Sequence, residues 1–249
     1  MVKSGLTKAR KSAGEIIYTG YFVDEPMPCS LVGHMGEHTA VIKIGDALHC
    51  IHIDELVEMQ TGFRAFARPD VFVVLDLETT GLNPRNDQII EIAAVKYVHG
   101  VESDVFETLV NPEFEISPLI TGITGIENEA LSNAPVISSI LPELISFLGN
   151  APVVGHNINS FDKKFLQAAY SKVGKEFKNK TIDTLQLSRK ALPDLPHHRL
   201  EDLKNELHIS VDVSHRALPD VYTTAEVYRI CSLKMIKRRY DETHAGSIK

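Results

Sequence analysis

The segment 71-VFVVLDLETTGL-82 joins a continuous apolar run to two acidic residues and a glycine-containing turn. The run VFVVL predicts a strand that is buried on both faces. Asp76 and Glu78 are two residues apart, so on a strand both side chains point to the same face. Two ionised carboxylates side by side in a core are costly without cations. Carboxylate oxygens suit Mg²⁺ or Mn²⁺, so the segment predicts a metal site; solvated acids at a strand end are the alternative.

The segments that follow predict a mixed α/β domain. Residues 87–100 and 101–112 read as two further strands, which gives a three-strand meander with the first one. Residues 136–149 have the apolar spacing of a helix, and the next strand covers 152–157. A second helix with one apolar face is expected over 161–173. The remaining patterned segments of this domain are 181–192, 199–209 and 219–236.

The chain divides into segments of different composition. Short β-like runs with turn residues between them, such as 38-HTAVIKI-44, predict a small antiparallel sheet or barrel near the N-terminus. The predicted organisation is a flexible basic arm at 1–14, a small β domain at 15–60, a linker at 61–69, the α/β domain at 70–236 and a C-terminal tail at 237–249.

Composition favours a globular protein of the cytoplasm. Of the 249 residues, 43% are hydrophobic and 24% are charged, and no apolar run approaches the roughly 18 residues that span a bilayer. The first residues lack the apolar core of a secretory signal. Cys29, Cys50 and Cys231 lie far apart and form no CxxC pair, which fits a reducing compartment. The net charge of −7 argues against a broad DNA-coating surface, but it allows a cleft that grips a few nucleotides.

Two later segments place polar residues at predicted helix starts. In 155-GHNINSFD-162, Ser160 is a candidate N-cap, and the helix dipole favours an ionised Asp162 in the first turn. In 215-HRALPD-220, Pro219 suits the first helical position, so that Asp220 opens the last helix. Each segment alone has an ordinary interpretation, because acids are common at helix starts and a lone loop histidine such as His215 is usually solvated.

Taken together, these segments resemble the DEDD exonuclease superfamily in its histidine-bearing branch, DEDDh. The resemblance covers Val71 to Met235 and rests on several motifs in register: DLETTGL, IIEIAAV, GHNINSFDKKFL, TIDTLQLSR, HHRLEDL and SHRALPD. It is closest to the proofreading exonucleases of bacterial replicative polymerases, namely the epsilon (DnaQ-like) subunit and the exonuclease region of PolC. The resemblance implies a ribonuclease H-like mixed sheet flanked by helices, and the small N-terminal β domain lies outside it.

The resemblance also implies roles for individual residues. Two divalent ions, Mg²⁺ or Mn²⁺, would be held by Asp76, Glu78, Asp162 and Asp220, with His215 as general base. Substrate contacts would come from Thr79, Thr80, Leu82, Asn157 and Phe161. One departure is Glu127, which stands where relatives usually have threonine or a similar small residue. This departure concerns fine details of nucleotide contact and not the chemistry.

The function implied by the resemblance is removal of nucleotides from DNA 3′ ends. We expect a two-metal 3′→5′ exonuclease that acts on single-stranded or frayed ends, releases 5′-mononucleotides and serves proofreading or repair, with a DNA polymerase as a candidate partner. Trimming of RNA or oligoribonucleotides uses the same chemistry and is the nearest alternative. A non-catalytic nucleic-acid or polymerase-binding module is the alternative of another class, although all five catalytic positions are filled.

Overall fold

The structure is a computed structural model in which the chain forms two compact units. One unit comprises Met1–Arg68 together with Ser232–Lys249, and the other comprises Pro69–Cys231. The structure describes residues 15–18, 27–34, 39–44, 47–52, 56–59, 69, 71–98, 101–211 and 216–244. The predicted arm at 1–14 and residues 61–68 of the predicted linker lie outside this set.

The described N-terminal strands form a five-stranded antiparallel sheet, in agreement with the predicted small β region. Its order is β4-β3-β2-β1-β5, and Ile42, one of the alternating apolar residues of 38-HTAVIKI-44, is fully buried. The strands are β1 (Glu15–Tyr18), β2 (Met27–His34), β3 (Thr39–Ile44), β4 (Ala47–His52) and β5 (Leu56–Met59).

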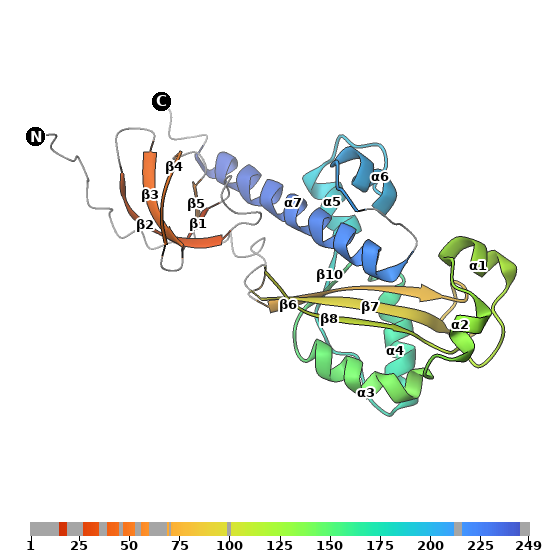
Figure 1. Ribbon diagram of the computed structural model, residues 1–249. Helices are drawn as coiled ribbons and strands as arrows, with labels where there is room; N and C mark the ends of the chain where they lie inside the picture. The colour runs from red at the N-terminus through yellow and green to blue at the C-terminus, as the bar shows by residue number, and fades with distance from the viewer. Residues whose placement is uncertain are drawn as a thin grey trace, which may run out of the picture. The chain divides into compact units, whose positions relative to one another are not determined.

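The second unit is built on a mixed five-stranded sheet of order β10-β9-β6-β7-β8 (Figure 1). The predicted meander is confirmed, because β6, β7 and β8 pair antiparallel in sequence order, whereas β9 and β10 add parallel strands beside β6. The strands are β6 (Val71–Thr79), β7 (Ile89–Val98), β8 (Val101–Leu109), β9 (Val153–Gly155) and β10 (Thr181–Asp183).

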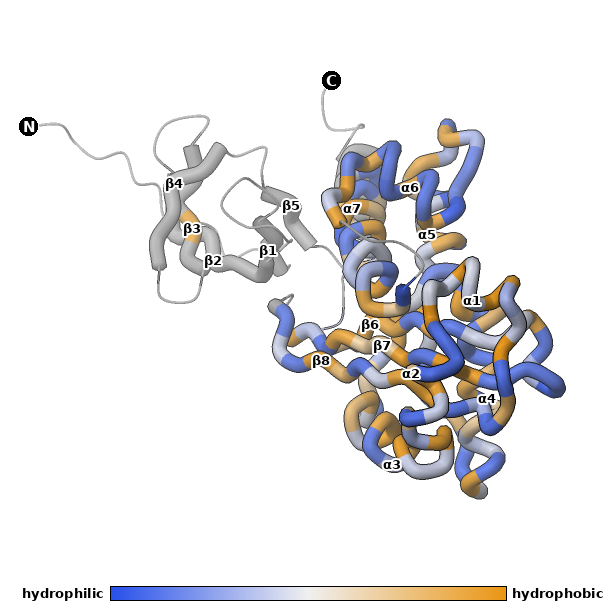
Figure 2. Tube along the Cα trace, turned by 45° about the vertical axis from the view of Figure 1, so that its right-hand side comes forward, coloured by the Kyte–Doolittle hydropathy of each residue, from blue (hydrophilic) through white to orange (hydrophobic). Residues whose placement is uncertain are grey.

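Strand β6 lies in the middle of this sheet because both of its faces are apolar. Its odd-numbered residues Val73, Leu75 and Leu77 join a core with the helices on one side, and Phe72 and Val74 join a second core with α7 on the other. Figure 2 shows hydrophobic residues along β6 and β7. Since alternate residues share a face, Asp76 and Glu78 belong to the α7 side of the sheet.

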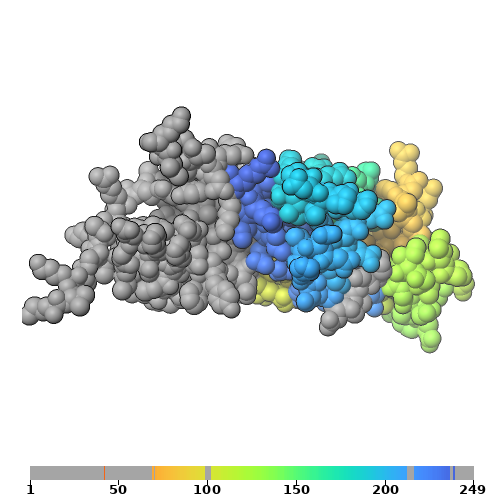
Figure 3. Space-filling view, turned by 90° about the horizontal axis from the view of Figure 1, so that it is seen from above, coloured from red at the N-terminus to blue at the C-terminus, as the bar shows by residue number. Residues whose placement is uncertain are grey.

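Helices cover both faces of the sheet (Figure 1). Those of the first core are α3 (Ile137–Leu148) and α4 (Asp162–Lys172), and α7 (Ala217–His244) packs on the opposite face. Helices α5 (Thr184–Ala191) and α6 (Leu200–Glu206) share a smaller core with α7. In the view from above, α5, α6 and α7 form one continuous part of the surface (Figure 3).

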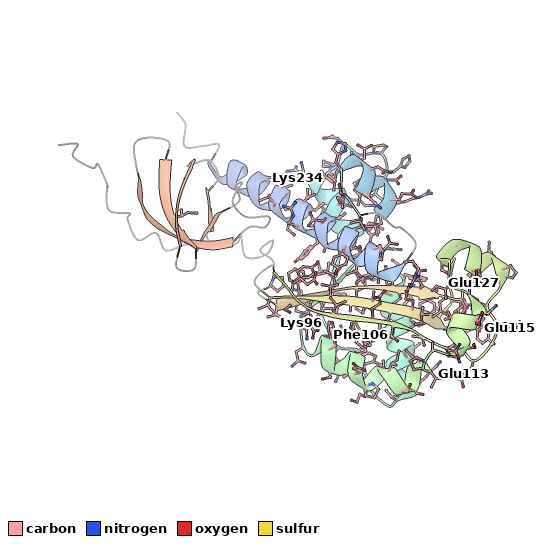
Figure 4. All side chains as sticks on the ribbon, in the orientation of Figure 1. Lys96, Phe106, Glu113, Glu115, Glu127 and Lys234 are labelled. Carbon is pink, nitrogen blue, oxygen red and sulfur yellow. The ribbon has the colours of Figure 1, made fainter. Side chains whose placement is uncertain are left out.

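Two short helices, α1 (Pro118–Thr124) and α2 (Asn128–Ser132), form a lobe after β8 that the sequence did not predict. A small apolar core that includes Ile90 of β7 holds the lobe to the sheet. At the other end of the strands, Lys96 lies 4.5 Å from the ring centroid of Phe147, which also packs on Phe106 (Figure 4).

The predicted helix starts are wrong in two details. The residue before α4 is Phe161, not Ser160, and its side chain makes no capping hydrogen bond. Helix α7 begins at Ala217, so Pro219 is not its first residue, and the helix continues to His244, past the domain end predicted at 236. None of the described helices combines the length and the apolar character needed to cross a membrane.

Candidate active site

Three carboxylates from two elements meet on the α7 side of the sheet. Asp76 and Glu78 lie near the end of β6, and Asp220 lies in the first turn of α7. One oxygen of each carboxylate lies within 4.8 Å of the others. Residues 142 positions apart in the chain are therefore brought into one acidic cluster, which is consistent with the metal site of DEDD exonucleases.

A fourth carboxylate, that of Asp162, enters from α4. It is the first residue of that helix, and its side chain is buried, with Oδ1 lacking a hydrogen-bond partner among the described residues. Asp162 is also the neighbour whose charge raises the pKa of Asp76 most. Asp76 therefore interacts with Asp162 as well as with the cluster of Glu78 and Asp220.

Three acids of this site, Asp76, Glu78 and Asp162, resist ionisation in the protein without cations. Burial raises the pKa of Asp76 well above its usual range, and the charges of Asp162, Glu78 and Asp220 raise it further. Burial also raises the pKa of Glu78 to about 7, with added effects from Asp220 and a further carboxylate, Glu91. The pKa of Asp162 rises to about 7, again mainly through burial.

These observations fit a site for hard divalent cations. Carboxylate oxygens are the ligands that Mg²⁺ and Mn²⁺ prefer, and a cation would replace the repulsion among the acids by attraction. Oδ1 of Asp162 is an acceptor without a hydrogen-bond partner among the described residues, and buried polar atoms normally have a partner. The donor set and the orphaned oxygen therefore both match the cations that the sequence predicted.

The turn after β6 is held by a network around Asp87. The backbone N–H of Asn83 donates to Oδ2 of Asp87 at 2.8 Å, and Oγ1 of Thr80 donates to Oδ1 at 3.4 Å. Gly81 lies against this carboxylate, because a Cβ at position 81 would come within 2.5 Å of Oδ2. Thr79 is buried, whereas Leu82 is 84% exposed, so the turn presents Leu82 to solvent close to the acids.

The loop before α4 is anchored by Asp183, at the end of β10. Its two carboxylate oxygens accept the backbone N–H groups of Asn157 and Asn159, each at 3.2 Å. Asn157 has a φ of 60°, a conformation that asparagine tolerates better than most residues. Phe161 packs on Phe165 with ring centroids 5.0 Å apart. Sequence reasoning did not single out Asp183, although it lies in the quoted motif TIDTLQLSR.

An ion pair between buried Glu91 and partly exposed Arg216 links β7 to the start of α7, and sequence reasoning missed it. Arg216 donates to both carboxylate oxygens of Glu91, and the closest contact, Nη2 to Oε1, measures 2.6 Å. The backbone N–H of Ala217 donates to Oε2 at 3.0 Å. The only hint in the sequence is that Glu91 interrupts an otherwise apolar strand, IIEIAAV.

The sequence also singled out His215 and Glu127. His215 lies outside the described residues, so its role stays a prediction. Glu127, the departure from the family pattern, directly precedes α2 and is exposed. It lies on the same lobe as Glu113 and Glu115, which makes this lobe acidic (Figure 4).

Sequence comparison assigns the second unit to a family. The profile of the RNase T exonuclease family matches residues 73–228, so the chain belongs to this family of DnaQ-like exonuclease domains. It is 38% identical over 197 residues to DNA polymerase III PolC-type from Caldanaerobacter subterraneus subsp. tengcongensis, covering 79% of this chain but 14% of that polymerase. It is also 38% identical over 159 residues to the DNA polymerase III epsilon subunit of Aquifex aeolicus, covering 63% of this chain and 78% of that subunit.

Solved structures share the fold. Exonuclease X in complex with 5′ overhanging duplex DNA superposes with a TM-score of 0.53 at 28% identity, over 68% of this chain and 92% of that one. E. coli Exonuclease I in complex with a dA16 oligonucleotide gives a TM-score of 0.60 at 21% identity, over 70% of this chain and 43% of that one. The mixed sheet with flanking helices, predicted as ribonuclease H-like, is therefore the DnaQ-like fold.

Proposed function

We propose that this protein is a two-metal-ion 3′→5′ exonuclease that removes 5′-mononucleotides from single-stranded or frayed DNA 3′ ends. The observation that carries the proposal is the convergence of Asp76, Glu78 and Asp220, with Asp162 beside them, in a chain of an exonuclease family. DNA is favoured over RNA because the relatives include DNA polymerase III chains and Exonuclease X bound to duplex DNA.

In this proposal Asp76, Glu78, Asp162 and Asp220 would hold the two cations. When bound, such ions lower the pKa of the attacking water and stabilise charge on the departing oxygen. His215 accepts the proton of the water, because histidine is the side chain whose reference pKa lies closest to neutral pH. The water oxygen bonds to the terminal phosphorus, the bond from phosphorus to the 3′-oxygen of the preceding nucleotide breaks, and that oxygen is protonated to a new 3′-hydroxyl.

The proposed substrate contacts come from the segments beside the acids. Thr79 is the last residue of β6, and Thr80 and Leu82 lie in the turn that follows it. Asn157 and Phe161 belong to the loop before α4. A duplex end must open before its last phosphate reaches the acids. Single-stranded and mispaired ends, which cost least to open, are therefore the preferred substrates. A polymerase that supplies such ends is the proposed partner, with proofreading or repair as the setting.

The test uses oligonucleotides of matched sequence in DNA and in RNA, each labelled at the 5′ end. With Mg²⁺ or Mn²⁺ we expect a ladder that shortens one nucleotide at a time from the 3′ end of DNA, and no cleavage of a circular single strand. Faster degradation of the RNA strand would replace the DNA assignment by RNA trimming. A lack of cleavage on every substrate, with retained binding of the strand, would support the non-catalytic alternative.

A further inference from the structure

The ion pair between Glu91 and Arg216 lies beside the acidic cluster, yet it has no part in the chemistry proposed above. Only 1% of the Glu91 side chain is exposed, whereas 41% of the Arg216 side chain is. Three contacts from the guanidinium and one from the backbone N–H of Ala217 involve both oxygens of Glu91. These hydrogen bonds therefore fix the orientation of the Glu91 carboxylate as well as its position.

The pair joins the two elements that supply the cluster. Glu91 is the cross-strand partner of Glu78 in the pairing of β6 with β7, so both side chains belong to the α7 face. On the other side, Arg216 directly precedes α7, and its carbonyl oxygen accepts the backbone N–H of Asp220 at 3.2 Å. The contact thus ties the first turn of α7, which carries Asp220, to the strand next to Glu78.

Stability alone is a poor explanation for this arrangement. Glu91 places another carboxylate close to acids that already repel one another, and its charge disfavours the ionised form of Glu78. Apolar residues of similar volume are often as stabilising as a buried ion pair. A bidentate ion pair, by contrast, fixes the position of one element relative to the other.

We propose that Glu91 and Arg216 are positioning residues that fix the start of α7 and so hold Asp220 in place for the divalent cations. This inference rests on the proposed function for its catalytic consequence. Arg216 also directly follows His215 in the chain. The same anchor therefore fixes the residue adjacent to the proposed general base.

The experiment compares R216A, R216K and E91Q in the full-length chain with R229A as a matched control. Arg229 pairs with Glu226 at 3.0 Å on the same helix, nine residues after Asp220, so its removal breaks an ion pair of α7 outside the site. Each variant is measured for Mn²⁺ affinity by calorimetry, for kcat and KM on a single-stranded DNA, and for thermal unfolding. The Mn²⁺ titration does not depend on nuclease activity.

We expect R216A and E91Q to bind Mn²⁺ about 10–100-fold more weakly and to lose a similar factor in kcat, as is usual when a residue that orients metal ligands is removed. KM for the DNA should change less than about twofold. R216K keeps the charge without the bidentate contact and should lie between R216A and the wild type. R229A should match the wild type in affinity and rate.

Several outcomes would overturn the inference. Wild-type Mn²⁺ affinity in R216A or E91Q, with only a lower unfolding temperature, would make the pair purely structural. A raised KM in R216A but not in E91Q would make Arg216 a substrate contact. If R216A does not fold, the Mn²⁺ affinities and rates of R216K and E91Q distinguish the positioning role from a purely structural one by the same criteria. If the wild type has no nuclease activity, the proposed function fails, and the Mn²⁺ affinities still decide on the positioning role.

Discussion

Asp76 is the residue on which the proposed site depends most, because it interacts with every other acid. Its carboxylate belongs to the cluster with Glu78 and Asp220, and Asp162 is the neighbour with the largest charge effect on it. An amide at this position keeps the shape of the side chain and removes its charge. The substitution therefore separates the electrostatic role of Asp76 from its packing on β6.

We predict that D76N loses nuclease turnover by about 10³-fold or more, because the cations supply several kcal/mol of transition-state stabilisation. Without cations the variant should unfold at a higher temperature than the wild type, since repulsion among the acids is relieved. Oligonucleotide cleavage and thermal unfolding in EDTA measure the two effects. Normal Mg²⁺-dependent cleavage by D76N would refute the assignment of the cation site.

We predict that H215A lowers kcat by about 10²–10⁴-fold, the usual effect of losing a general base. Calorimetric Mg²⁺ binding should be retained, because the carboxylates are intact. The wild-type rate should rise with pH through the histidine pKa and then level off, and this rise should vanish in the variant. The same pH profile in both proteins would exclude His215 as the base.

Individual residues could be predicted from the sequence where the chemistry dictates the residue type. Carboxylates are the ligands that hard divalent cations prefer, and the spacing of Asp76 and Glu78 on a buried strand pointed to such a cation, with solvated acids at a strand end as the alternative. Glu91 and Arg216 could not be paired in this way, because they are 125 positions apart and their contact depends on how α7 packs on the sheet. Asp183 was missed for the same reason, since its role depends on the fold of a distant loop.

At the scale of elements, the turn after β6 is shaped by the absence of a side chain at Gly81. A methyl group there would collide with Asp87, whose carboxylate is held by the backbone of Asn83. We predict that G81A lowers kcat/KM by about 10–100-fold through displacement of the turn, with Mg²⁺ affinity unchanged. G122A is the matched control, because a Cβ at Gly122 meets nothing within 4 Å. Equal kinetics for the two variants would show that the turn does not place the substrate.

One strand residue, Glu78, and one residue at a helix start, Asp162, together create a pH dependence of stability. Glu78 and Asp162 titrate near pH 7 in the folded protein but near pH 4 when unfolded. The folded state thus binds more protons between these values, so stability without cations is greatest below about pH 4 for these groups and is lost as pH rises through about 7. The repulsion behind this loss is what cations relieve.

We therefore predict that the unfolding temperature of the protein in EDTA falls between about pH 5 and pH 8. The variant E78Q, measured in the same way, shows how much of this fall comes from groups other than Glu78. Mg²⁺ should raise the unfolding temperature, and more at pH 8 than at pH 5, because binding requires the ionised carboxylates. Calorimetry at a series of pH values with and without Mg²⁺ tests this. A stabilisation by Mg²⁺ that does not depend on pH would place the bound cations elsewhere.

Helices and strands were predicted correctly where the apolar pattern was strong. The prediction failed where capping or packing determines the end of an element. The meander of β6, β7 and β8 was predicted correctly, and its first strand stands out in the sequence as a continuous apolar run. The start of α7 was misplaced because the proline rule favours Pro219, whereas the contact of Glu91 with Arg216 and Ala217 anchors the chain two residues earlier. The lobe of α1 and α2 was missed because its helices have seven and five residues, too short for a periodic pattern.

At the scale of the whole molecule, the carboxylates of the proposed site all belong to the unit Pro69–Cys231. The family match, residues 73–228, also lies within that unit. We propose, as the sequence suggested, that residues 1–14, 15–60 and 61–69 form an accessory arm, β domain and linker outside the catalytic domain at 70–236. The accessory part would hold nucleic acid or a protein partner.

We predict that a fragment starting at Ala67 folds and cleaves short oligonucleotides at the wild-type rate, because it keeps every proposed catalytic residue. The fragment should bind longer strands more weakly than the full chain does at low salt, and the difference should shrink as salt rises, because the basic residues between 3 and 11 would contribute phosphate contacts.

A full-length variant with these basic residues changed to serine separates the contribution of the arm from that of the β domain. Salt-dependent loss in both proteins would assign the contacts to the arm, and loss in the fragment alone would assign them to the β domain. An insoluble fragment, or one inactive on a dinucleotide, would show that residues 1–66 are part of the catalytic fold and that the proposed boundary is wrong.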